Sequence, residues 1–118
     1  MIDINGYEQL NEIIWNNKDK LILLYFGASW CGPCQQLKEK IVKEKDEIKD
    51  MVVLHLDCDL EENEDIVSDW QISALPTQIF VHLEDTNVVK DDRIEGYDWI
   101  KLKMVYDELD KKRKNENN

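Results

Sequence analysis

The stretch Trp30-Cys31-Gly32-Pro33-Cys34 places two thiols three residues apart, next to a glycine and a proline. The run before it, Leu21-Ile22-Leu23-Leu24-Tyr25-Phe26-Gly27, is apolar enough to predict a buried central strand. After it, apolar residues recur at helical spacing among lysine and glutamate, which predicts an amphipathic helix; they are Leu37, Ile41 and Ile48. The motif therefore lies where a strand turns into a helix.

Cys31 is expected at the N-terminus of that helix. There the unpaired backbone N–H groups and the helix dipole favour the thiolate over the thiol. Since the thiolate is the nucleophile in thiol–disulfide exchange, this position suits a reactive cysteine. We therefore interpret Cys31 and Cys34 as a redox pair and not as an inert buried pair.

Composition limits the size of the protein and its partners. With 118 residues, 42% of them hydrophobic, the chain can bury one core. Lys and Arg total 15 against 26 Asp and Glu, and the net charge of -11 argues against nucleic acid or an anionic membrane as a partner. Residues 57–69 are acidic and lack basic residues; we interpret them as a solvated loop and helix start, with a surface that selects basic partners as the alternative.

The N-terminus, Met1-Ile2-Asp3-Ile4-Asn5-Gly6, has neither a basic region nor an apolar one, so no secretory signal is visible. The longest apolar stretch, over 21–28, is too short to span a bilayer. Three cysteines without a signal suggest a reducing compartment, and we expect a cytoplasmic protein. A chain trimmed of its targeting segment would look the same.

Periodicity predicts one domain over residues 1–110, followed by a solvated tail over 111–118. The expected strands are 2–4, 21–27, 51–56, 78–83 and 88–94, and the expected helices 7–15, a segment after Cys34, 63–70 and 99–109. Strands that alternate with helices, followed by a hairpin and a helix, predict an α/β domain with a mixed sheet. We expect Trp15, Trp70 and Trp99 to pack in or beside the core.

Three segments together resemble the thioredoxin family, and the resemblance covers about residues 2–109. They are the predicted strand over 21–27, the run Ala28-Ser29-Trp30-Cys31-Gly32-Pro33-Cys34 that follows it, and the later Ala74-Leu75-Pro76-Thr77. The resemblance implies the thioredoxin fold, a central mixed β-sheet flanked by four helices. It also implies a cis peptide bond between Leu75 and Pro76, beside the two cysteines.

The resemblance implies a role for each matched residue. Cys31, exposed at the start of the helix, attacks a substrate disulfide, and Cys34, one turn further in, resolves the mixed disulfide. Pro33 stiffens the first helical turn and Gly32 allows another backbone to approach. Further contacts to the substrate are expected from Trp30, Leu75 and Pro76.

The function implied by the resemblance is that of an enzyme, a thioredoxin-type protein-disulfide reductase and general electron donor. Its expected partners are disulfide-containing proteins and a thioredoxin reductase, with no bound cofactor or metal, and the protein is expected to be a monomer. One alternative is a pathway-specific oxidoreductase, such as the electron donor of a peroxidase. Another is a binding module that uses the Trp30 and Leu75 surface, with incidental redox activity.

Two of the departures from the family pattern bear on proton transfer. Tyr25 stands where many members carry a buried aspartate that is regarded as the proton acceptor for the second thiol, and His55 stands where a lysine or glutamate often faces that aspartate. Tyrosine is neutral near pH 7, whereas histidine titrates there. We hypothesise that His55 partly replaces the carboxylate as the proton partner of Cys34, with a satisfied core histidine as the alternative.

Other chemistry-bearing residues have simpler interpretations. His55 and Cys58 would join the cysteine pair as zinc ligands at compatible spacings, but residues three apart on a strand point to opposite faces. Cys58 is expected to be a small apolar residue at a strand end, with a regulatory thiol as the alternative. His82 is expected to be a strand residue without chemistry.

Overall fold

The computed structural model describes residues 1–116. One mixed sheet has the strand order β1-β3-β2-β4-β5. Its strands are β1 (Ile2–Asp3), β2 (Leu21–Gly27), β3 (Met51–Asp57), β4 (Thr77–Glu84) and β5 (Asn87–Glu95). The pairs β1·β3 and β2·β3 are parallel, whereas β4 pairs antiparallel with both β2 and β5. The predicted α/β class and mixed sheet are confirmed.

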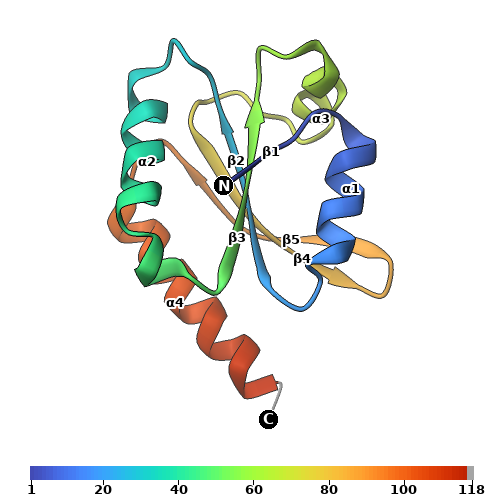
Figure 1. The fold of residues 1–118 in the computed structure, drawn as a ribbon, viewed down its shortest axis with the longest axis vertical. Helices are drawn as coiled ribbons and strands as arrows, with labels where there is room; N and C mark the ends of the chain where they lie inside the picture. Colours follow the sequence, from blue (N-terminus) through green and yellow to red (C-terminus); the bar gives the residue numbers. More distant parts are fainter. Residues whose placement is uncertain (117–118) are drawn as a thin grey trace.

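Four α-helices flank this sheet, with two on each face (Figure 1). They are α1 (Tyr7–Asn16), α2 (Gly32–Lys43), α3 (Glu64–Asp69) and α4 (Trp99–Glu116), joined by the short 3-10 helices η1 (Lys45–Ile48) and η2 (Glu61–Asn63). Helices α2 and α4 cover one face, and α1 and α3 cover the other (Figure 1). The expected helix through Ile48 is therefore two pieces, because α2 ends at Lys43 and η1 carries Ile48.

The central strand β2 is buried on both faces because it contributes side chains to two separate cores. Leu23 and Tyr25 point into the core beneath α2 and α4, while Leu24 and Phe26 point into the core beneath α1 and α3. A strand covered by helices on both sides needs apolar residues at successive positions. This explains why the sequence shows a continuous apolar run in place of an alternating one.

The register places the site at one edge of the sheet. In the parallel pair, Tyr25 lies opposite His55 and Gly27 opposite Asp57, so β2 and β3 end side by side. Helix α2 begins a few residues beyond β2, above the carboxyl ends of both strands. Ligand sites of open α/β sheets lie at this edge.

The segment after residue 110 differs from the prediction. Helix α4 continues without interruption to Glu116. Arg113 and Lys114 both pair with Asp110, and Lys114 also reaches Asp50. These ion pairs join the last turns to one another and to the domain, so the helix runs past its predicted end at Leu109, while most residues over 111–116 stay exposed to solvent. Residues 117–118 lie outside the described residues.

The three tryptophans do not share one environment. Trp70 is buried and packs against Phe26, and Trp99 packs at the edge of the core, as expected. Trp15 is 46% exposed, and the Lys18 ammonium lies 3.8 Å from its ring centre, so the predicted core role of Trp15 is wrong. Within residues 1–116, none of the helices is long and apolar enough to cross a membrane.

Candidate active site

The cysteine pair opens helix α2. Cys31 is the N-cap residue, and the Cys34 N–H donates to the Cys31 sulfur at 3.2 Å. The two sulfurs lie at disulfide distance, with their Cα atoms 5.2 Å apart. Pro33 occupies the first turn, where a missing N–H costs no hydrogen bond. When the pair is reduced, the same N–H and the helix dipole stabilise a thiolate on Cys31.

Accessibility separates the two sulfurs less than expected. We predicted an exposed Cys31, but it is buried, with 7% of its surface accessible, and Cys34 is at 0%. The indole of Trp30 is 71% exposed, as expected for a residue that offers contact area. The expected order of reaction remains consistent with the structure, since Cys31 is the only one of the pair with accessible surface.

A carboxylate holds the indole of Trp30. Its Nε1–H donates to Asp59 Oδ2 at 2.8 Å, and Asp59 follows directly after the half-buried Cys58. The sequence did not predict this contact. Its only signal is an acidic residue shortly after a strand that runs parallel to β2, which brings it to the edge where α2 begins.

The proline loop completes this face of the molecule. The Leu75–Pro76 peptide bond is cis, as the resemblance implied. Leu75 packs against the core cluster that contains both cysteines, and the Gly96 N–H donates to the Pro76 carbonyl at 2.7 Å. Gly32, by contrast, has open space where a side chain would stand, which agrees with its expected role in allowing a substrate to approach.

Tyr25 lies beneath the cysteine pair. Its ring is 1% exposed, and its hydroxyl donates to the Cys34 carbonyl oxygen at 2.6 Å. Burial, together with the nearby Cys58, raises the pKa of Tyr25 to about 12. The side chain is therefore neutral at physiological pH and acts on the Cys34 turn as a hydrogen-bond donor.

His55 stacks on Tyr25 and pairs with Asp3. The two rings lie 5.0 Å apart at 26°, and His55 Nδ1 is 2.9 Å from Asp3 Oδ1. Among residues 1–116, no hydrogen bond joins His55 to the Cys34 turn. The hypothesis that His55 takes the Cys34 proton directly therefore has no hydrogen bond to support it.

Cys58 has the environment of an unreactive thiol. Burial, followed by the charges of Asp57 and Asp59, raises the pKa of Cys58 to about 11. Its backbone N–H donates to the Gly27 carbonyl and so joins the ends of β2 and β3. Over residues 1–116, no group of three or more His, Cys, Asp or Glu side chains is arranged to hold a metal ion, and this includes the four candidate zinc ligands.

Fold and site together define a class of protein. A cysteine pair at a helix N-terminus, beside a cis-proline loop on a mixed α/β sheet, is a site for dithiol–disulfide exchange. The family model Thioredoxin matches residues 4–104, so the chain belongs to the thioredoxin family.

Known proteins agree with this membership. A thioredoxin structure from Trichomonas vaginalis superposes with a TM-score of 0.82 at 27% identity, covering 92% of this chain and 96% of that one. Thioredoxin-T of Drosophila melanogaster is 32% identical over 66% of this chain and 49% of its own length. Monothiol glutaredoxin-4 of Schizosaccharomyces pombe is 33% identical over 91% of this chain and 41% of its own. The chain thus spans half or less of these two curated relatives.

Proposed function

We propose that this protein reduces disulfide bonds in other proteins by thioredoxin-type dithiol–disulfide exchange. The observation that carries the proposal is the position of Cys31, which caps α2 with its sulfur accepting the Cys34 N–H and its partner sulfur at disulfide distance. The exposed indole of Trp30 beside this sulfur supports a protein as the substrate, because a large rigid ring offers contact area that a small disulfide does not need.

The reaction has two displacement steps. The Cys31 thiolate attacks one sulfur of the substrate disulfide, which forms a mixed disulfide and releases the other substrate sulfur as a thiolate. The Cys34 thiol then loses its proton and attacks the Cys31 sulfur, which closes the Cys31–Cys34 disulfide and releases the second substrate thiolate. Both substrate thiolates take up protons, so the substrate gains two electrons and the cysteine pair loses two.

A turnover leaves the pair oxidised, and a second protein must reduce it. By analogy with the family, we assign this step to a thioredoxin reductase, with the protein working as a monomer in a reducing compartment such as the cytoplasm. Fluorescence microscopy of the tagged protein and sedimentation of the pure protein test the location and the monomer.

The central experiment is the reduction of insulin disulfides by dithiothreitol, with this protein as catalyst. Catalysis should be lost in Cys31→Ser and retained in Cys58→Ser, because only the first change removes the nucleophile. Catalysis by Cys31→Ser equal to that of the parent would refute the proposal.

A pathway-specific electron donor is a second candidate, and the neutral Tyr25 beneath the cysteine pair favours it, since an altered site suits specialisation. A binding module is a third, favoured by the 71% exposure of Trp30. Partners recovered as mixed disulfides with Cys34→Ser distinguish them. One dominant partner indicates a dedicated donor, many indicate a general reductase, and partners retained by Cys31→Ser/Cys34→Ser indicate a binding module.

A further inference from the structure

Tyr25 is the buried polar side chain that touches the cysteine pair. Its hydroxyl group is enclosed by protein and donates its hydrogen to the Cys34 carbonyl at 2.6 Å. A carbonyl oxygen has two lone pairs, so this oxygen can accept the tyrosine hydroxyl as well as the usual helical N–H. The bond therefore ties the first turn of α2 to the central strand beneath it.

The neighbouring glycine makes room for this contact. A Cβ atom on Gly27 would lie 3.0 Å from the Tyr25 hydroxyl oxygen, 3.1 Å from the ring carbon that carries it, and 3.4 Å from the Cys34 Cβ. A side chain at Gly27 would therefore crowd the hydroxyl end of the hydrogen bond and meet the Cys34 Cβ at ordinary contact distance. The glycine at the end of β2 allows the tyrosine to stand where it reaches Cys34.

We propose that Tyr25, with the space left by Gly27, is a positioning residue for the resolving step, and that it sets the place of Cys34 without accepting its proton. This inference rests on the proposed exchange reaction. Cys34 is fully buried, so its sulfur reaches the Cys31 sulfur only if its backbone is held in place. The Tyr25 hydroxyl, on the strand beneath α2, fixes the position of the Cys34 backbone through this hydrogen bond.

The proposal assigns the proton in the resolving step. Cys34 loses a proton, its sulfur bonds to the Cys31 sulfur, and the bond between Cys31 and the substrate sulfur breaks. The hydroxyl hydrogen of Tyr25 is engaged by the Cys34 carbonyl, and the side chain stays neutral, so it does not take this proton near pH 7. The proton passes through solvent and is balanced by the proton that the departing substrate thiolate takes up.

The titratable groups around Tyr25 come from three elements. Cys34 faces it from α2, His55 stacks on it from β3, and Cys58 lies near it beyond the end of β3. Asp57 and Asp59 flank Cys58, and Asp3 pairs with His55. The pH dependence of the resolving step should therefore be that of the Cys34 thiol, with the same midpoint whether or not the tyrosine hydroxyl is present.

The test follows both displacement steps with the small disulfide 5,5′-dithiobis(2-nitrobenzoate). Attack by Cys31 releases one coloured thiolate at a rate that depends on reagent concentration, and closure by Cys34 releases the second at a rate that does not. Tyr25→Phe should slow closure roughly 2- to 10-fold, the factor that one neutral hydrogen bond is worth, and leave the attack rate within about 2-fold. Gly27→Ala should do the same, because it displaces the hydroxyl without removing it.

Tyr106→Phe is the matched control, since Tyr106 is also buried and its hydroxyl accepts the Asp50 N–H at 3.4 Å, away from the cysteines. Tyr106→Phe should change neither the attack rate nor the closure rate. The double variant Cys31→Ser/Cys34→Ser measures the background reaction of the reagent with Cys58. Equal slowing of both phases, unchanged closure in Tyr25→Phe, or a shifted pH midpoint for closure would overturn the proposal. Failure of the parent to reduce insulin would instead refute the proposed function, because the small reagent needs no protein substrate.

Discussion

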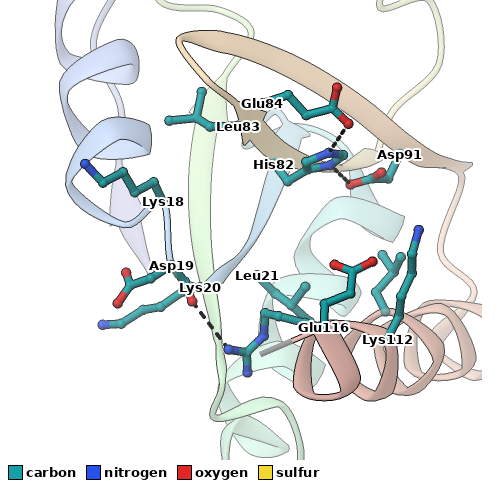
Figure 2. Close-up of a pocket in the computed structure, with 12 residues that line it drawn as sticks. Lys18, Asp19, Lys20, Leu21, His82, Leu83, Glu84, Asp91, Lys112 and Glu116 are labelled. Atoms are coloured by element: carbon teal, nitrogen blue, oxygen red, sulfur yellow. Dashed lines mark hydrogen bonds and ion pairs between the residues drawn. The ribbon is translucent and has the colours of Figure 1, made fainter. Parts of the chain in front are cut away.

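The side chains at the two ends of the sheet are held by different interactions. At the carboxyl ends of β2 and β3, the groups that hold the cysteine pair are neutral: the Cys34 N–H and the Tyr25 hydroxyl. At the other end of the hairpin pair, His82 lies between two carboxylates, with Nδ1 2.8 Å from Asp91 and Nε2 3.2 Å from Glu84 (Figure 2). The cysteine pair is thus positioned by neutral hydrogen bonds, whereas the side chains at the distant end are positioned by ion pairs.

This difference indicates which property of the protein depends on each end of the sheet. Hydrogen bonds from the backbone and a neutral hydroxyl keep the same strength over the physiological pH range, whereas pairs of exposed charges are weakened by salt and by titration. Changes at the cysteine end should therefore alter exchange, and changes around His82 should alter only stability and its dependence on pH. Each prediction below tests one side of that division.

The largest expected effect is on the cysteine pair itself. Because Cys31 attacks and Cys34 resolves, Cys34→Ser should accumulate mixed disulfides with protein partners, whereas Cys31→Ser should trap none. Non-reducing electrophoresis followed by mass spectrometry measures the trapped species. Equal trapping by both variants would show that the sulfurs are not distinguished by their places on α2.

The next effect is on stability, at Asn63 near the cysteine end. This side chain is fully buried, and its amide donates to the Ile4 and Asp57 carbonyls at 3.0 and 3.1 Å while its oxygen accepts the Gly6 N–H at 2.9 Å. Asn63→Ala leaves three backbone groups without these partners, which should lower the free energy of unfolding by roughly 2–4 kcal/mol.

Urea unfolding measures this loss, and Asn11→Ala is its control, since Asn11 is exposed on α1 and its replacement should cost nothing. A similar midpoint for the Asn63 variant and the parent would mean that water replaces the three bonds without cost.

Local patterns predicted most of the fold. The apolar run of β2, the helical period after the cysteines and the strand-like runs 78–83 and 88–94 predicted β2, the start of α2 and the β4–β5 hairpin close to where they lie. Each of these signals depends on neighbours within one element, so they can be read along the chain. The site residues Cys31 and Cys34 were proposed from their motif and its place before a helix, and Pro76 was proposed from the resemblance to the thioredoxin family.

Contacts between distant segments were not predicted. The bonds of Asn63 to Ile4 and of Trp30 to Asp59 join residues 59 and 29 positions apart, and nothing local distinguishes Asn63 or Asp59 from an exposed polar residue. Periodicity also overestimated the apolar face of α1, where Trp15 lies outside the core. The length of α4 was underestimated, because the apolar spacing ends at Leu109 while the helix continues through charged residues that pair with Asp110 and Asp50.

A smaller effect is expected at Trp30, on the catalytic side of the division. Trp30→Ala should lower kcat/KM for insulin roughly tenfold, because an exposed aromatic anchor is removed, and should leave the rate with a small disulfide nearly unchanged. Trp30→Phe keeps a ring but loses the bond to Asp59, so its kcat/KM for insulin should lie between that of the parent and that of Trp30→Ala. Equal losses toward both substrates would contradict a role in binding proteins.

The smallest expected effect is at the charged end, in His82→Gln. Burial alone lowers the pKa of His82, but the hydrogen bonds and charges of Asp91 and Glu84 outweigh it and raise the pKa above its ordinary value of 6.5. A histidine whose pKa is raised by folding stabilises the fold fully below its unfolded pKa, and this stabilisation is lost as pH rises through the folded pKa. The side chain is 37% exposed, so solvent screens the pair and the effect is small.

His82→Gln should therefore be less stable than the parent by ~0.2–1 kcal/mol near about pH 6 and equal to it near about pH 9, as measured by urea unfolding at each pH. Added salt should shrink the difference at the lower pH. The rate of insulin reduction should be the same in both proteins, because His82 lies at the end of the hairpin away from the cysteines. A stability difference that grows with pH, or slower insulin reduction, would contradict the division between a cysteine pair held by neutral groups and a distant end held by ion pairs.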